Sequence, residues 1–277
     1  MCYTLSMSAN NLSVFYHYVL DVAKQCGIGV EESLGRVRAM GYEGLAFDIV
    51  FLTDRPAQRR LYQAAGLAVT SVYADVDFVH WQPERCWRAA NDLLDCCAFF
   101  GARTALVLPG VFKDGDDQVA GLRKIYAGLE TVCRLGADAG IDVTVENFGF
   151  AGSPNGPIAG CRDMLANVEG LKFTLDTGNF ACFGEDPFTA YADLKDSIAY
   201  VHLKERPRGP DGRIVIDNAP VGDGALELDR LIRTLVADGY AGAFAVEQFG
   251  LADQLAALRR SADFCRRALG RPPLPHS

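Results

Sequence analysis

Four short apolar stretches of this sequence each end in an ionisable residue: VTVE ends at Glu146, KFTLD at Asp176, AYVH at His202 and FAVE at Glu247. Three carboxylates and one imidazole are a good ligand set for one divalent metal ion, Mn²⁺, Mg²⁺ or Co²⁺, with coordination positions left for two substrate oxygens. Without a cation, three converging carboxylates would repel one another. The alternative is that each residue is an ordinary polar strand end that faces solvent or caps a helix.

Such a centre suits the removal of a proton from a carbon next to a carbonyl group. A metal ion chelated by the carbonyl oxygen and the neighbouring hydroxyl would act as Lewis acid and template. Glu146 and Glu247 could then supply a base on one side and an acid on the other. Return of the proton to the opposite face gives epimerisation, its return to the adjacent carbon gives isomerisation, and loss of a β-hydroxyl gives dehydration. The ligand set cannot distinguish these reactions.

The elements that must position these residues are short apolar runs that alternate with longer amphipathic stretches. This alternation is typical of βα units in a parallel sheet, and we count eight of them. In a barrel of this kind the strands end at the catalytic face, so the four ionisable residues would surround one point. The predicted strands are Tyr3–Met7, Gly44–Asp48, Ala68–Tyr73, Ala105–Leu108, Asp142–Glu146, Lys172–Asp176, Ile198–His202 and Ala243–Glu247.

The predicted helices often end at a glycine, which accepts the left-handed backbone conformation that closes a helix. Such glycines are Gly41, Gly66, Gly101, Gly140 and Gly239. The stretch Leu12–Cys26 reads as an extra helical element ahead of the first barrel helix. The other predicted helices include Val30–Met40, Pro83–Phe100, Gln118–Ala139, Asp186–Asp196, Leu226–Asp238 and Asp253–Leu269.

This rhythm predicts an α/β fold, a single (β/α)8 TIM barrel over residues 1–270, with a proline-rich C-terminal tail over residues 271–277. The structural rival is an open doubly wound sheet. That fold usually carries a glycine-rich phosphate turn after its first strand, and MSANNLS lacks one.

Composition narrows the classes of partner. A formal net charge of -8 and a pI near 5.0 disfavour nucleic acid and anionic membranes as partners, and favour a small molecule. We find no signal peptide and no run of 18 apolar residues, and therefore expect a cytoplasmic protein. The nine cysteines have no repeated spacing, which predicts reduced, mostly buried thiols.

The motifs around the four strand ends resemble those of the sugar phosphate isomerase/epimerase group of xylose isomerase-like barrels. This group includes tagatose 3-epimerase, hydroxypyruvate isomerase, inosose dehydratase and 3-dehydroshikimate dehydratase. The resemblance implies that Glu146, Asp176, His202 and Glu247 are the metal ligands and that the two glutamates are the catalytic acid/base pair. The matching segments, in the family's order, are Val145–Asn147, Leu175–Asn179, Val201–Lys204, Pro220–Gly224 and Val246–Glu247.

Two positions depart from the pattern of the group. Many members carry His three residues after the ligand Asp, where this chain has Asn179, and Lys204 is followed by Glu205 rather than the commoner Asp. The barrel also hosts relatives of endonuclease IV, which need several zinc ions and many histidines. Only four histidines and an acidic charge balance argue against such a role.

Several polar residues near the strand ends are candidates for binding the substrate: Lys204, Asn147, Asn179, Asp48, Tyr73 and His80. For each, ordinary loop packing, turn formation or solvation is the alternative. His17, on an apolar helical stretch, reads as a satisfied structural histidine. The two glycines of PVGDG could bring amides toward a phosphate, but that signal is weak.

We therefore expect a metal-dependent isomerase or epimerase of a sugar or related polyol, in carbohydrate metabolism. A metal-dependent dehydratase of a keto-cyclitol or dehydroshikimate type is the close alternative. A third hypothesis, of a different functional class, is a catalytically silent barrel that binds a sugar or a protein partner. Barrels of this kind often associate, so a homo-oligomer stays open.

Overall fold

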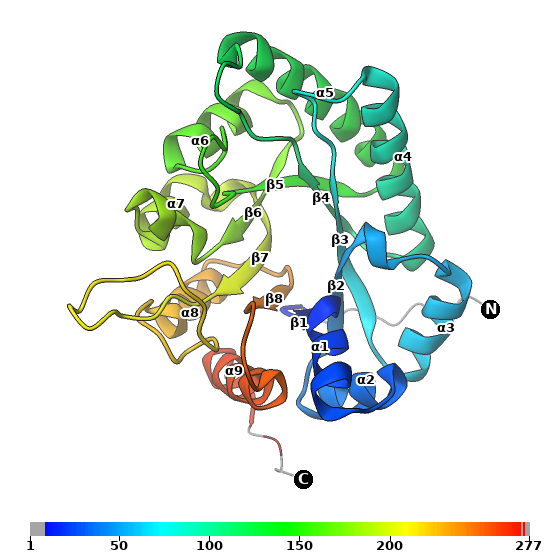
Figure 1. Cartoon of the computed structure of the whole chain (residues 1–277), viewed down its shortest axis with the longest axis vertical. Helices are drawn as coiled ribbons and strands as arrows, with labels where there is room; N and C mark the ends of the chain where they lie inside the picture. Colours follow the sequence, from blue (N-terminus) through cyan, green and yellow to red (C-terminus); the bar gives the residue numbers. More distant parts are fainter. Residues whose placement is uncertain (1–8, 273, 275–277) are drawn as a thin grey trace. The chain divides into compact units, whose positions relative to one another are not determined.

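The computed structural model describes residues 9–272 and 274. Its strands are parallel neighbours in sequence order and close into an eight-stranded barrel (Figure 1). The predicted (β/α)8 fold class is therefore confirmed. The strands are β1 (Leu12–Phe15), β2 (Gly44–Asp48), β3 (Ala68–Asp75), β4 (Thr104–Leu108), β5 (Asp142–Glu146), β6 (Lys172–Asp176), β7 (Ile198–Lys204) and β8 (Phe244–Glu247).

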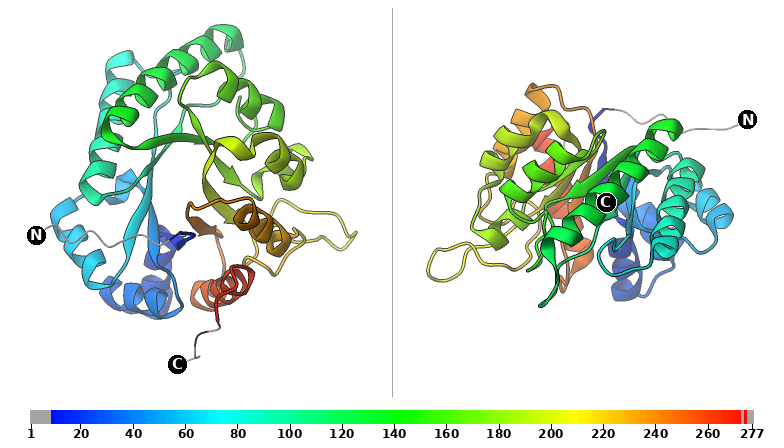
Figure 2. Two further views of the ribbon diagram at one scale, coloured as in Figure 1. Left: turned by 180° about the vertical axis from the view of Figure 1, so that it is seen from behind. Right: turned by 90° about the horizontal axis from the view of Figure 1, so that it is seen from above.

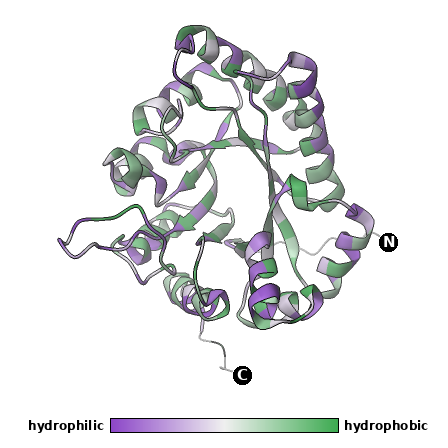
Figure 3. Cartoon of the chain, in the orientation of Figure 1, coloured by the Kyte–Doolittle hydropathy of each residue, from purple (hydrophilic) through white to green (hydrophobic). Residues whose placement is uncertain are grey.

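Hydrophilic and hydrophobic residues alternate along the helices between the strands (Figure 3), as expected of helices with one face in the core. The five glycines that were predicted to close helices all have positive φ angles, from 69° to 94°. The α-helices are α1 (Tyr16–Cys26), α2 (Val30–Ala39), α3 (Arg55–Ala64), α4 (Pro83–Phe100), α5 (Gln118–Ala139), α6 (Ile158–Asn167), α7 (Pro187–Leu194), α8 (Leu228–Ala237) and α9 (Gln254–Ala268), with 3₁₀ turns η1 (Ile49–Phe51), η2 (Asn179–Phe183) and η3 (Lys195–Ser197).

The chain divides into two compact units, and the first takes in the described parts of residues 1–47, 52–70 and 201–277. Within it β1 pairs with β2 and with β8, and β8 pairs with β7. The first residue of β2, Gly44, leaves no space for a side chain. A Cβ atom there would lie 2.5 Å from Ser13 Oγ and 2.4 Å from a methyl group of Thr70. The hairpin-like loop between Glu205 and Ala219 extends away from β7 and α8 in each view (Figures 1 and 2).

The second unit contains residues 48–51 and 71–200. Within it β4 pairs with β3 and β5, and β5 pairs with β6. Helices α4 and α5 pack against each other and against β4 and β5. The buried residues of α4 recur at helical spacing, as in Cys86, Ala90, Leu93 and Cys97, so one face of this helix packs into the core.

The start of the fold differs from the prediction. Leu12–Phe15 was expected to be helical but is the first barrel strand, and the helix begins only at Tyr16. The predicted strand Tyr3–Met7 lies outside the described residues. Two strands also run further than expected, β3 to Asp75 and β7 to Lys204.

The eight cysteines within the described residues are all free thiols, as predicted, and six of them are buried. Burial raises the pKa of the Cys133 thiol to about 12, which makes it unreactive. No helix in the described part of the chain is long and apolar enough to cross a membrane.

Candidate metal centre

Glu146 and Asp176 close the adjacent strands β5 and β6 in the second unit. Glu146 is in register with Thr174, two residues before Asp176. Because side chains alternate along a strand, Thr144 shares a face with Glu146, and Thr174 shares a face with Asp176. The Thr174 hydroxyl donates to the Thr144 hydroxyl at 2.8 Å. On its own strand, each carboxylate therefore lies two residues beyond one member of a buried, hydrogen-bonded threonine pair.

Asn147 continues the β5–β6 pairing after the strand residues end. Its side-chain Nδ2 donates to the backbone carbonyl of Asp176 at 2.8 Å, and its Oδ1 accepts from the Asp176 amide at 2.9 Å. The side chain of Asn147 thus makes the two hydrogen bonds to the Asp176 backbone that a further residue of a neighbouring strand would otherwise make. Asn155, fully buried, donates in the same way to the Glu146 carbonyl at 2.6 Å.

The Asp176 carboxylate is also oriented by its own turn. The amides of Gly178 and Asn179 both donate to Oδ1, each at 2.8 Å. Such local bonds are typical of an Asp that begins a turn. Both bonds are made to Oδ1, and together they fix the orientation of the Asp176 carboxylate.

His202, Lys204 and Glu247 form the part of the centre that belongs to the first unit. His202 and Lys204 are two residues apart on β7 and share a face, and Lys204 is in register with Glu247 on β8. Lys204 Nζ lies 2.7 Å from Glu247 Oε1, and His202 Nδ1 lies 3.3 Å from Glu247 Oε2. The parallel register therefore produces a buried ion pair beside the imidazole.

Aromatic rings surround this group. The Phe15 ring meets the His202 ring edge-on, with 4.9 Å between centroids. Lys204 Nζ lies 5.6 Å from the centre of the Phe249 ring, which is 44% exposed. The Gln248 amide donates to the Tyr18 hydroxyl at 2.8 Å, so the residue after Glu247 is also held in place.

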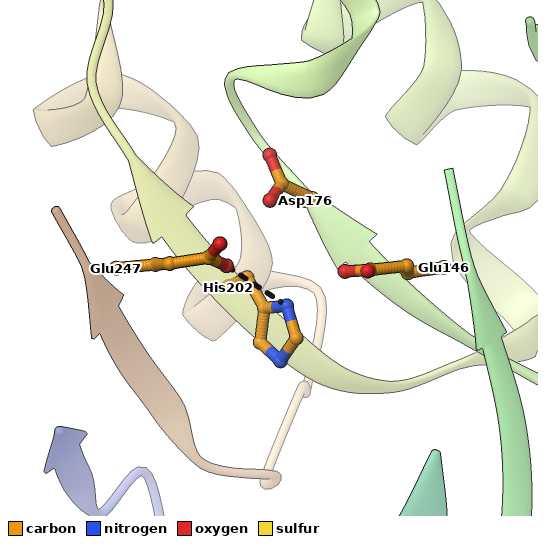
Figure 4. A group of neighbouring side chains, drawn as sticks. All are labelled: Glu146, Asp176, His202 and Glu247. Atoms are coloured by element: carbon orange, nitrogen blue, oxygen red, sulfur yellow. Dashed lines mark ion pairs between the residues drawn. The ribbon is translucent and has the colours of Figure 1, made fainter. Parts of the chain in front are cut away.

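All four predicted ligands come together. Each offers one ligand atom, and these atoms lie within 4.8 Å of one another (Figure 4). Glu146 and Glu247 close strands β5 and β8, which are not neighbours in the strand order, and Figure 4 draws the four side chains as one group. Their exposures are 7% for Glu146, 0% for Asp176, 2% for His202 and 6% for Glu247.

This donor set fits a divalent cation. Three buried carboxylates this close together are costly without a compensating charge, and one lysine offsets only part of it. Oxygen donors with one imidazole suit Mg²⁺, Mn²⁺ and related ions.

The remaining predicted site residues lie at or near strand ends. Asn179 is buried in the turn after β6, and its side chain lies against Gly149. Asp48, at the end of β2, accepts from the Val50 amide at 3.0 Å, and burial raises the pKa of its carboxyl group. Tyr73 is half-buried within β3. The negative charge of Asp75, which was not among the predicted site residues, raises the pKa of Asp48 further.

His80 contacts two carboxylates instead of standing open in its loop. Its Nδ1 lies 2.8 Å from Asp77 Oδ2, and its Nε2 lies 2.9 Å from Asp116 Oδ2. Neither partner was identifiable from the sequence, because neither ends an apolar strand and Asp116 is 36 residues away from His80.

The amides of the PVGDG segment are directed at a carboxylate of the protein itself. The buried Glu205 side chain accepts from Gly222 at 3.2 Å and from Leu226 at 3.0 Å, and the Gly224 amide also bonds it. The glycines that could have bound a phosphate therefore have amides that bind Glu205 instead. Glu205, which stands where the related group more often has Asp, holds this loop in place.

The family follows from the sequence itself. The model of the xylose isomerase-like TIM barrel family matches residues 34–268, and the chain belongs to that family. A comparison with curated protein sequences finds no match.

Solved structures share the fold at low identity. D-Allulose 3-epimerase from Methylomonas sp. is 13% identical with a TM-score of 0.74, over 95% of this chain and 99% of that one. The probable 3-DHS dehydratase AsbF from Bacillus anthracis is 16% identical with a TM-score of 0.72, over 91% and 97%. A xylose isomerase-like TIM barrel protein from Mycobacterium smegmatis, in complex with magnesium, is 16% identical with a TM-score of 0.70, over 97% and 98%. At these identities the likeness shows the fold alone.

Proposed function

We propose that this chain is a divalent-metal-dependent isomerase or epimerase that transfers a proton next to the carbonyl group of a sugar or related polyol. The observation that carries the proposal is the buried cluster of Glu146, Asp176, His202 and Glu247. The similarity to D-allulose 3-epimerase supports the substrate class.

The four clustered residues would hold the ion. A bound divalent ion would supply Lewis-acid stabilisation of the negative charge that develops on the substrate carbonyl oxygen. The protein fixes the donors beforehand, since Asn147 and Asn155 hold the backbone of Asp176 and Glu146. Donors held in place in this way need little rearrangement when the substrate binds.

Glu146 and Glu247 are the proposed acid/base pair. They close two strands that are not neighbours in the barrel, β5 and β8, so one carboxylate can remove a proton while the other delivers one from a different side. Lys204 orients Glu247 through the 2.7 Å ion pair, and this contact gives the two glutamates different surroundings. Different surroundings are what separate an acid from a base in one site.

The proposed substrate contacts are Lys204, Asn179, Asp48 and Tyr73. Asn147 and His80 have protein contacts that favour positioning roles instead.

A dehydratase is the second candidate, because the probable dehydratase AsbF shares the fold and because the same donor set can stabilise the oxyanion that precedes loss of a β-hydroxyl. The reaction products distinguish a dehydratase from an epimerase. Dehydration of a keto-cyclitol produces a conjugated enone with strong ultraviolet absorbance, whereas epimerisation leaves the number of carbonyl groups and double bonds unchanged.

The test is proton exchange in deuterated water. The purified protein, with one equivalent of Mn²⁺ or Mg²⁺, is incubated with a panel of ketoses, and deuterium next to the carbonyl is followed by NMR. We expect incorporation with the wild type and its loss, by at least about 100-fold, in Glu146→Gln and Glu247→Gln.

Metal content is measured on the same samples, because either substitution also removes a proposed ligand. Glu84→Gln, at an exposed position on α4, is the matched control and should keep full exchange. Full exchange in both active-site variants would disprove the acid/base assignment. A wild type that binds no stoichiometric divalent ion would favour the silent barrel.

A further inference from the structure

His80 lies in the loop that follows β3 and is bracketed by two carboxylates. Asp77 Oδ2 lies 2.8 Å from its Nδ1, and Asp116 Oδ2 lies 2.9 Å from its Nε2. A carboxylate oxygen only accepts hydrogen bonds, so both ring nitrogens must donate. Both can do so only in the doubly protonated, cationic imidazolium form.

The two carboxylates belong to different loops, and each also orders its own. Asp77 Oδ1 accepts from the amides of Val79 and His80, each at 3.0 Å, within residues 76–82 after β3. Asp116 Oδ2 accepts from the Lys113 amide at 2.7 Å, within residues 109–117 after β4. His80 is therefore a side-chain link between two internally ordered loops.

The backbone brings the two loops together at their bases. The Val76 amide donates to the Leu108 carbonyl at 2.9 Å, and the Phe78 amide donates to the Pro109 carbonyl at 3.1 Å. Gly110 has a φ angle of 104°, and a Cβ atom there would lie 2.5 Å from Asp77 Oδ1. A glycine at this position allows the Asp77 side chain to approach the second loop. The His80 link to Asp116 then joins the loops further from the strands.

The charges around His80 favour the cation. Hydrogen bonds to Asp77 and then Asp116 raise the pKa of His80 above its ordinary value, while partial burial and Lys113 oppose them. Asp116 responds in the opposite direction, since bonds from the Lys113 amide and His80 lower the pKa of its carboxyl group.

Other polar groups reach this region from the neighbouring helices. On α4, Cys86 Sγ donates to the Asp77 carbonyl at 3.4 Å, and the Arg85 guanidinium lies 3.7 Å from the centre of the Trp81 ring. On α5, Lys124 Nζ donates to the Val79 carbonyl at 3.2 Å. The His80 side chain is 24% exposed, so protons can exchange with solvent.

We propose that His80 is a proton-dependent clasp between the loops after β3 and β4. In the protonated form it holds residues 109–117 against residues 76–82. Loss of one proton leaves a nitrogen lone pair facing a carboxylate, so one of the two bonds is replaced by a repulsive contact. When the proton lost is the one on Nε2, which faces Asp116, residues 110–117 lose their side-chain attachment to the β3 loop, while the backbone bond from Phe78 to Pro109 remains. Both loops follow the carboxyl ends of strands, where barrels bind ligands, so the proton state of His80 controls loop order at that end.

The test measures amide hydrogen exchange of the full chain by mass spectrometry between about pH 6 and pH 9, with correction for the intrinsic pH dependence of exchange, alongside NMR titration of His80. In the wild type we expect protection of residues 110–117 to fall as pH rises through the pKa of His80. The fall should be about tenfold for each unit by which the clasp raises that pKa.

Three variants make the result specific. His80→Gln should expose residues 110–117 at all pH values in this range. Asp116→Asn should do the same and return the pKa of His80 toward its ordinary value of about 6.5. Asp114→Asn removes an exposed carboxylate from the same loop and should behave like the wild type. Protection that is independent of pH in the wild type, or unchanged in both His80→Gln and Asp116→Asn, would overturn the clasp.

Discussion

His17 is a half-buried imidazole among aromatic rings. Its ring stacks on Phe249, with 5.2 Å between centroids and 14° between planes, and meets Tyr18 edge-on at 4.0 Å. Burial lowers the pKa of His17 to about 4. Its Nε2 atom is buried and has no hydrogen-bond partner among the described residues, so packing against aromatic rings is the main contact of this imidazole.

This histidine should make the protein sensitive to acid. In the unfolded chain His17 titrates near 6.5, so between about pH 6.5 and pH 4 the unfolded state binds more protons and stability falls as pH falls. The loss attributable to His17 should approach roughly 3 kcal/mol at pH 4. His17→Phe keeps a stacking ring without the titration, so its free energy of unfolding should fall less over that range in urea unfolding experiments.

His80→Gln is the control for this effect, because the pKa of His80 is shifted in the opposite direction. Its contribution to stability is present at low pH and is lost as pH rises above about 6.5, so the variant should differ from the wild type mainly at the acidic end and converge with it at high pH. Equal acid sensitivity of His17→Phe and the wild type would contradict the role assigned to His17.

At the same scale, the sequence predicted which four side chains converge but few of the residues that hold them. Glu146, Asp176, His202 and Glu247 were identifiable because each closes an apolar strand, and parallel strands end at one edge. Asn155 and Asp116 lie in loops, where side-chain contacts depend on a chain path that no periodicity encodes. The Asn147 side chain replaces backbone hydrogen bonds between strands, but in the sequence it looks like any asparagine of a turn.

Among the elements, the segment after β7 depends on one buried carboxylate. Glu205 Oε1 accepts from the amides of Arg206 at 2.9 Å and Leu226 at 3.0 Å, while Oε2 accepts from the Gly222 amide at 3.2 Å. Burial nevertheless raises the pKa of this carboxyl group, since the surroundings are poorly solvated. One side chain thereby fixes both ends of the loop that leads into α8.

Glu205→Gln should loosen this loop. The amide NH₂ group of glutamine cannot accept a hydrogen bond, so at least one buried backbone amide would face a donor. We expect a loss of roughly 1–3 kcal/mol in the free energy of unfolding, together with faster amide exchange over residues 220–226. Glu227→Gln breaks only an exposed pair with Arg230 and should change stability by less than about 1 kcal/mol. Equal stability of the two variants would refute this role for Glu205.

The elements themselves were largely predictable, with one instructive failure. Helices that end at glycine were located well, because the positive φ angle is a local requirement of one residue. The strand β1 was missed because it passes into α1 without a turn, so LSVF and the helix after it read as one apolar stretch. Its identity is set by pairing with β2 and β8, which are distant in sequence. Helix α3 buries only Tyr62 and gave little apolar signal.

For the whole molecule, the formal net charge of -8 is compatible with the proposed cation and neutral polyol, since both approach an acidic protein without repulsion. The four clustered donors are spread from Glu146 to Glu247 in sequence, so unfolding must separate them. Metal binding should therefore stabilise the folded chain by RT ln(1 + [L]/Kd), or about 2.7 kcal/mol at a metal concentration of 100 Kd.

Lys204 offers a sharp test of this linkage, because it is the cation nearest to Glu247, at 2.7 Å, and both side chains are only 7% exposed. Lys204→Met should destabilise the metal-free protein by roughly 3–5 kcal/mol, since it leaves a buried carboxylate without its partner. Removal of that positive charge should also strengthen the attraction of the cluster for a divalent ion. The stabilisation by Mn²⁺, measured as the difference between unfolding in EDTA and in excess metal, should thus be larger in Lys204→Met than in the wild type. Lys24→Met, at an exposed position on α1, should leave both quantities unchanged. Should Mn²⁺ leave the unfolding of the wild type and of Lys204→Met unaltered, the cluster would not be a metal centre.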